Sequence, residues 1–127
     1  MKLHLAGTPG RNLFSGYGTG YVAINGQRYE RSLIVLPDRI LEWDIERFDQ
    51  LAPPVFQYLA GLSIDVLVLG TGDALRFPSH ACLQSLTRAG IGIEVMDTPA
   101  ACRTYNVLLA EDRRVAAAVL VVKNQRG

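Results

Sequence analysis

The fold is decided by three apolar runs, DVLVL at residues 65–69, IGIEVM at 91–96 and VAAAVLVV at 115–122. Near-continuous apolar runs of this length are typical of strands that are covered on both faces. The first run leads directly into Gly70-Thr71-Gly72, which is typical of a tight exit from a strand. We therefore predict three buried strands in the second half of the chain.

Two helices are predicted between these strands, mainly from their caps. Ser79 is a candidate N-cap for a helix through Arg88, with Gly90 just past its end. Thr98 is predicted to cap the next helix, with Pro99 at its first position. An apolar stripe on that helix is expected to face the sheet: Ala101, Tyr105, Leu108 and Leu109. The resulting β-α-β-α-β order implies three parallel strands joined by right-handed crossovers.

The first half of the chain is predicted to be rich in strands. Asn25-Gly26 between two short runs predicts a hairpin, because a type I′ turn needs positive φ at both central positions. The Pro53-Pro54 pair is typical of a helix start. The predicted elements are strands at 21–24, 27–29, 32–36 and 40–43, a turn at Pro37-Asp38, and a helix over 55–60 that ends at Gly61.

The composition bounds the class of protein. The 127 residues include 13 Lys+Arg and 12 Asp+Glu, a net charge of +1, and 49% are hydrophobic. This apolar content excludes intrinsic disorder, and the charge balance argues against a basic nucleic-acid-binding domain. We predict a single α/β domain over residues 1–127, with residues 1–15 and 123–127 less ordered.

No membrane or secretory feature is predicted. The N-terminus shows no signal peptide or Arg-rich presequence, and the longest apolar run is far shorter than the ~20 residues that span a bilayer. Cys82 and Cys102 form no CxxC motif, and two cysteines are too few for a disulfide-rich secreted scaffold. We therefore expect reduced thiols in a cytoplasmic protein.

A candidate site lies where the parallel strands end. Ligands of open α/β sheets bind at the carboxyl ends of the strands, where the connections diverge to opposite faces. Thr71 is therefore expected near Asp97 and Thr98. The following helix offers free backbone N–H groups at its start, and Arg103 and Asn106 share one of its faces. The pattern is that of a small polar pocket for an anionic group. The simpler interpretation is that these residues cap the helix and tie the loops.

Other candidates are weaker on geometry. Gly16-Tyr17-Gly18-Thr19-Gly20 precedes a strand, so a turn or bulge is favoured over a phosphate loop. His80, Cys82 and Cys102 lack the spacing of metal ligands, so no metal or cofactor is predicted. Cys102 in the first turns of a helix is a candidate nucleophile if exposed, but a buried small apolar residue is the favoured interpretation. No catalytic residue is assigned.

Three motifs together carry a family resemblance. They are EVMDTPAACRTYN at residues 94–106, Gly70-Thr71-Gly72, and Gly16-Tyr17-Gly18-Thr19-Gly20 with Ile24-Asn25-Gly26. The chain resembles a family of small, uncharacterised α/β proteins of bacteria and archaea. That family includes the mitochondrial assembly factor three of respiratory complex I (NADH:ubiquinone oxidoreductase).

The resemblance implies a three-layer α/β fold with a mixed sheet and a β-rich, hammerhead-like N-terminal half. It also implies no established enzymatic activity and a function through binding. The family's signature residues fall at the edge chosen above, and we take them as a tentative ligand-binding set: Gly70, Thr71, Gly72, Asp97, Thr98, Arg103, Tyr105 and Asn106.

Two functional hypotheses follow. The first is a non-enzymatic interaction or assembly factor with an unidentified protein partner. It predicts an exposed apolar patch, to which five aromatic residues could contribute: Tyr17, Tyr21, Trp43, Phe48 and Phe56. The alternative is a protein or enzyme that binds a small anion at Thr71, Asp97, Thr98, Arg103 and Asn106. A homo-oligomer through the N-terminal hairpins is compatible with both. Neither a nucleic-acid partner nor a membrane span is predicted.

Overall fold

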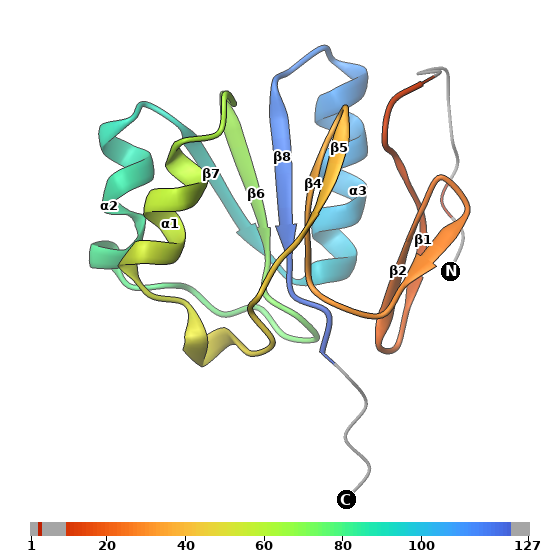
Figure 1. Cartoon of the computed structure of the whole chain (residues 1–127), viewed down its shortest axis with the longest axis horizontal. Helices are drawn as coiled ribbons and strands as arrows, with labels where there is room; N and C mark the ends of the chain where they lie inside the picture. The colour runs from red at the N-terminus through yellow and green to blue at the C-terminus, as the bar shows by residue number, and fades with distance from the viewer. Residues whose placement is uncertain (1–2, 4–9, 123–127) are drawn as a thin grey trace, which may run out of the picture.

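The computed structural model describes Leu3 and residues 10–122, which form two β-sheets and three α-helices (Figure 1). The smaller sheet is antiparallel, in the order β1-β2-β3. Its strands are β1 (Phe14–Gly18), β2 (Tyr21–Ile24) and β3 (Gln27–Tyr29). Asn25 and Gly26 have φ of 51° and 86°, which confirms the predicted hairpin turn. The register of β1 shifts at Ser15, between Phe14 and Gly16. Within the glycine-rich run, residues 16–18 pair regularly with β2 and residues 19–20 form the turn, so the predicted turn is present and the irregularity lies just before the run.

The larger sheet has five strands in the order β5-β4-β8-β6-β7. They are β4 (Leu33–Leu36), β5 (Arg39–Glu42), β6 (Val66–Gly70), β7 (Gly92–Met96) and β8 (Val115–Val119). The strand β6 is parallel to both β7 and β8, whereas β4 is antiparallel to β5 and β8. The sheet is therefore mixed, and its three parallel strands are those predicted from the apolar runs.

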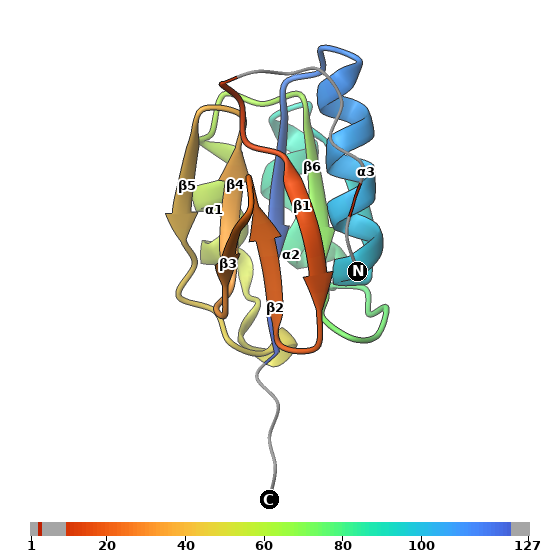
Figure 2. The same ribbon diagram turned by 90° about the vertical axis from the view of Figure 1, so that its right-hand side faces the viewer.

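The helices and the smaller sheet lie on the two faces of this larger sheet. The helices α1 (Pro53–Ala60) and α2 (His80–Arg88) cover one face, and a short 3-10 helix, η1 (Phe48–Gln50), precedes α1. The helix α3 (Thr98–Ala110) and the smaller sheet cover the other face (Figures 1 and 2).

Side chains alternate between two cores along the central strands. In β6, Val66 and Val68 pack with α3 and the smaller sheet, whereas Leu67 and Leu69 pack with α1 and α2. Both sets are almost fully buried, because the strand is covered on both faces. This arrangement is the physical origin of the continuous apolar runs in the sequence.

The N-terminal segment and the bounds of β5 differ from the sequence-based expectations. The lower order expected for residues 1–15 is wrong at its end, because Leu13 and Phe14 are buried and Phe14 begins β1. The rest of that expectation falls largely on residues 1–2 and 4–9, which lie outside the described residues, as does 123–127. The strand expected at 40–43 begins and ends one residue earlier, so Trp43 lies beyond β5.

Candidate functional site

The carboxyl ends of β6, β7 and β8 meet at one edge of the larger sheet. The connection after β6 leads to α2 on one face, and the connection after β7 leads to α3 on the other. Because the connections after the neighbouring strands β6 and β7 lead to opposite faces, a switch point lies between these strands, the usual place for a ligand in an open α/β sheet. The strands bring Gly70, Thr71, Gly72, Asp97 and Thr98 together at this edge, as the sequence predicted.

Thr98 is the centre of a closed hydrogen-bond group at the edge. Its hydroxyl Oγ1 donates to the carbonyl oxygen of Leu120 at 2.7 Å and accepts from the backbone N–H of Gly72 at 2.9 Å. Its own backbone N–H donates to the carbonyl oxygen of Gly72 at 2.9 Å. Thr98 is only 7% exposed, so this hydroxyl joins the ends of β6, α3 and β8 away from water.

Thr71 ties the loop that follows β6. Its hydroxyl donates to the carbonyl oxygen of Ala74 at 2.6 Å and accepts from the backbone N–H of Arg76 at 3.2 Å. Its backbone N–H donates to the carbonyl oxygen of Met96 at 2.9 Å. The Thr71 side chain is thus engaged inside the loop.

The prediction that Thr98 caps α3 is wrong, because the cap is Asp97. The Asp97 carboxylate oxygen Oδ1 accepts from the backbone N–H of Ala100 at 2.9 Å, and Thr98 and Pro99 occupy the first two helical positions. The physical reason is that the Thr98 hydroxyl already bonds the strand ends. A consequence is that a carboxylate of the chain itself accepts from one of the N–H groups expected to bind an anion.

The other three predicted site residues attach the smaller sheet to α3. The Asn106 amide accepts from the backbone N–H of Phe14 at 3.0 Å and donates to its carbonyl oxygen at 2.9 Å, as a neighbouring strand would. The Tyr105 ring is fully buried and edge-on to Phe14, and its hydroxyl donates to the carbonyl oxygen of Asn12 at 3.0 Å. Arg103 is exposed and donates to the Tyr17 hydroxyl.

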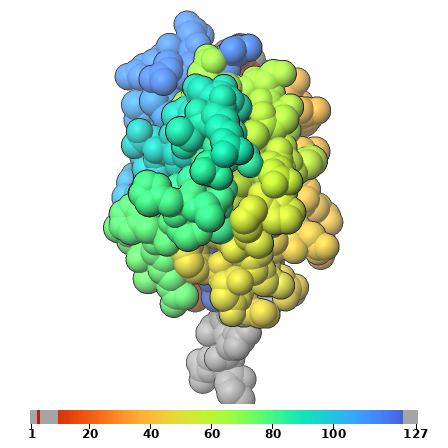
Figure 3. Space-filling model, turned by 90° about the vertical axis from the view of Figure 1, so that its left-hand side faces the viewer, coloured from red at the N-terminus to blue at the C-terminus, as the bar shows by residue number. Residues whose placement is uncertain are grey.

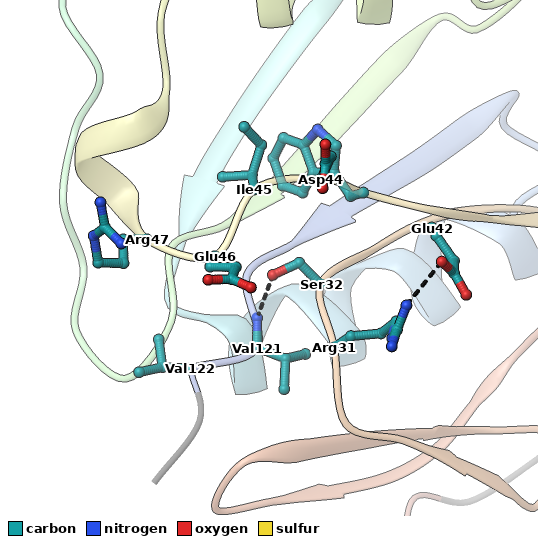
Figure 4. A pocket seen from close by; sticks show the side chains of 10 residues that line it. Arg31, Ser32, Glu42, Asp44, Ile45, Glu46, Arg47, Val121 and Val122 are labelled. Carbon is teal, nitrogen blue, oxygen red and sulfur yellow. Dashed lines mark hydrogen bonds and ion pairs between the residues drawn. The ribbon is translucent and has the colours of Figure 1, made fainter. Parts of the chain in front are cut away.

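A hollow of about 430 Å³ lies at the same end of the molecule (Figure 4). Sequence reasoning did not find it. The feature of the sequence that could have indicated it is the alternation of charged and apolar residues from Glu42 to Glu46. In the structure the apolar residues Trp43 and Ile45 are buried, and the charged residues of this segment are exposed. Its lining residues are Arg31, Ser32, Glu42, Trp43, Asp44, Ile45, Glu46, Arg47, Val121 and Val122. Within the lining, Arg31 pairs with Glu42 at 2.8 Å, and Ser32 Oγ accepts from the Val121 N–H at 3.0 Å.

Two of the four exposed large apolar residues in the described chain lie on the loop between β6 and α2, and the other two, Tyr58 and Val107, lie on α1 and α3. Trp43 and Phe56 are buried, so their predicted place in an exposed patch is wrong. The other three predicted residues, Tyr17, Tyr21 and Phe48, are half-buried. By contrast, Leu75 is 52% and Phe77 is 69% exposed. Figure 3 shows this loop in green beside the yellow segment that holds η1.

The two cysteines are buried and free. Burial raises the pKa of the Cys102 thiol from its ordinary 9.0 to about 12, although the neighbouring Arg103 charge opposes the rise. Burial likewise raises the pKa of the Tyr105 hydroxyl. No group of His, Cys, Asp and Glu side chains within the described residues could hold a metal ion. The favoured interpretation of Cys102, a buried apolar residue, is confirmed.

We expect Cys102 of the folded protein to resist an aromatic disulfide reagent at pH 8, since the reactive thiolate is disfavoured by burial. The folded state holds this proton more tightly than the unfolded state. The contribution of the Cys102 thiol to the free energy of unfolding is therefore fully present below pH 9. Between pH 9 and pH 12 that contribution falls by about 1.4 kcal/mol per pH unit. A Cys102→Ala variant isolates the signal of Cys82, and urea-unfolded protein gives full reaction. Rapid native reaction of Cys102 would contradict its buried state.

Known proteins resemble the chain over most of its length. Residues 14–120 match the profile of a family described as "Protein of unknown function (DUF498/DUF598)". The NADH dehydrogenase (ubiquinone) 1 alpha subcomplex assembly factor 3 of Danio rerio is 38% identical over 99 residues, 76% of this chain. The chain spans 57% of the length of that relative.

Two solved bacterial structures share the fold. A protein from Bordetella parapertussis has a TM-score of 0.84 at 34% identity, covering 91% of this chain and 99% of that one. A structure described as an outer membrane protein from Bartonella henselae has a TM-score of 0.73 at 33% identity, covering 91% and 98%. In the described part of this chain, no helix is both long and apolar enough to cross a bilayer.

Proposed function

Because the chain belongs to the DUF498/DUF598 family of proteins of unknown function, we propose that it is a non-enzymatic, protein-binding assembly factor for a respiratory complex. Support for this role comes from the Danio rerio relative, whose name is that of an assembly factor for NADH dehydrogenase. The structural observation that carries the proposal is the exposed apolar pair Leu75 and Phe77 on the loop after β6.

The loop over residues 71–79 is held at both ends, which favours binding. The Thr71 hydroxyl bonds Ala74 and Arg76 at its start, and the Ser79 hydroxyl accepts from the Cys82 N–H at the start of α2. Between these anchors, the Arg76 guanidinium lies 5.8 Å from the centroid of the Phe48 ring. A loop that is already held loses less conformational entropy when a partner covers it. Leu75 and Phe77 are therefore suitable apolar anchors for a partner protein.

The proposal predicts that a Leu75→Ser/Phe77→Ser variant loses binding without loss of fold. We expect a tagged chain expressed in its native host to enrich subunits of NADH:ubiquinone oxidoreductase, and the variant to reduce that enrichment by about tenfold or more. The measurement is quantitative mass spectrometry of the eluate, with thermal unfolding as a check on the fold.

The matched control is Tyr58→Ser/Val107→Ser, which removes two equally exposed apolar side chains from α1 and α3. It should leave the enrichment unchanged. If the Leu75→Ser/Phe77→Ser variant enriched these subunits as strongly as the control variant does, the loop would not be part of the interface. Absence of respiratory-complex subunits from the wild-type eluate would remove the assembly role itself.

The alternative, a small anion at Thr71, Asp97, Thr98, Arg103 and Asn106, has less support. Each of these side chains already has a partner within the protein. The hollow beside Thr98 and Tyr17 measures only about 30 Å³, room for little more than a water molecule. We also predict that the protein is cytoplasmic. A homo-oligomer in which the N-terminal hairpins pair is compatible with the main proposal.

A further inference from the structure

A second large hollow lies at the opposite end of the sheet. The turn between β4 and β5 and the turn between α3 and β8, which contribute to it, lie at the top of Figure 1. Its volume is about 610 Å³. Four separate segments form it: residues before β1, the turn between β4 and β5, the residues before β6, and the turn between α3 and β8. The charged residues of its lining are Arg11, Arg39, Arg113, Arg114, Asp38 and Asp112.

The hollow collects the arginines that lack a partner. Most described arginines elsewhere pair with a carboxylate, a tyrosine hydroxyl or an aromatic ring. Within residues 10–122, four arginine side chains form no hydrogen bond, ion pair or ring contact. Three of them line this hollow, Arg11, Arg39 and Arg113, and the fourth is Arg88. The unpartnered guanidinium groups are thus concentrated at one place.

The nearby carboxylates form no ion pair with these three arginines. Arg114 also lines the hollow, but both of its bonds go to the Asp65 carboxylate, at 2.8 and 3.1 Å. Asp38 and Asp112 are lining residues, yet in the described part of the chain neither lies within 4.0 Å of an arginine nitrogen. Three exposed arginines, Arg11, Arg39 and Arg113, therefore line the hollow without an ion pair to a described carboxylate, so their hydrogen-bond donors are available to a ligand.

We propose that this hollow binds an organic anion that bears a phosphate group. Guanidinium forks match phosphate oxygens, and a tetrahedral dianion can accept from arginines that approach from different segments. A planar carboxylate is matched by a single fork. The hollow is much larger than a phosphate ion, and Leu36, Pro37 and Ile64 offer an apolar wall for the organic part. This site is distinct from the loop surface of the proposed function.

The test is a titration of the full chain with phenyl phosphate, followed by backbone amide NMR at constant ionic strength. We expect saturable shifts confined to the amides of residues 11, 38–39, 63–64 and 112–115. Inorganic phosphate should bind at the same residues more weakly, because it lacks the organic part. An Arg39→Gln/Arg113→Gln variant should weaken phenyl phosphate binding by about tenfold or more. Arg114 is left intact, since its bridge to Asp65 supports the fold.

Arg88→Gln is the matched control, because Arg88 is equally exposed and unpartnered but lies on α2, away from the hollow. It should bind phenyl phosphate as the wild type does. Arg39→Lys/Arg113→Lys should bind with intermediate affinity, since charge remains and the fork is lost. Two results would overturn the proposal: shifts that do not saturate, or an Arg88→Gln variant that binds phenyl phosphate as weakly as the Arg39→Gln/Arg113→Gln variant. Either result would mean that the anion responds to the overall charge of the protein and not to this hollow. Shifts at the amides of residues 71–73, 97–98 and 100–103 instead would place the anion at the carboxyl edge and also overturn the proposal.

Discussion

Replacing Gly70 by valine is expected to lower the free energy of unfolding by about 3 kcal/mol. Gly70 ends β6 directly beneath the first turn of α3. A Cβ at this position would lie 3.0 Å from the Ala101 Cβ, the Thr98 Cα and the Thr98 Oγ1. Valine adds two further methyl groups to this contact, so α3 must move away from the sheet. Urea unfolding followed by circular dichroism measures the change.

Gly92→Val is the control for that experiment. Gly92 begins the neighbouring strand β7, and a Cβ there would meet no atom closer than 3.6 Å. We expect a change within about 1 kcal/mol, because valine also favours the extended backbone. If the two variants were equally stable, the close approach of α3 to β6 at Gly70 would be disproved.

The second large effect is expected for Thr98→Val, a loss of about 2 to 4 kcal/mol of unfolding free energy. Valine has nearly the same shape as threonine but cannot make the two hydrogen bonds of the Thr98 hydroxyl. The carbonyl oxygen of Leu120 and the N–H of Gly72 would then stay buried without these partners. The same urea titration measures the loss.

Thr98→Ser separates the hydroxyl from the methyl group. Serine retains both hydrogen bonds, so most of the stability should remain. Amide hydrogen exchange at Gly72 gives a local readout, and it should accelerate in Thr98→Val alone. A valine variant as stable as the wild type would show that the strand ends do not depend on this hydroxyl.

Much of the fold could be predicted, because its signals are local. The apolar runs of β6 and β8 result from burial on both faces, and Asn25-Gly26 and Ser79 act within a few residues of themselves. The cap of α3 could not be assigned in this way. Asp97 and Thr98 are both good N-caps, and the choice depends on the distant carbonyl group of Leu120, which engages Thr98.

The candidate site was only partly predictable for the same reason. The parallel strands brought Thr71, Asp97 and Thr98 together as expected. Asn106, however, bonds the backbone of Phe14, which is 92 positions away in the chain. Nothing near Asn106 in the sequence indicates that partner. The arginines at the other end of the sheet are also scattered, and only the turns that hold them bring them to one hollow.

The position of β8 has a consequence for synthesis of the protein. The strand β8 follows the other described strands along the chain, yet it lies between β4 and β6, and β4 forms no native pair with β6. While a ribosome is still elongating the chain, β4 and β6 therefore each expose an edge that only residues 115–119 can cover. The larger sheet cannot close progressively from the N-terminus. We therefore expect the nascent chain to be most prone to aggregation before β8 has emerged.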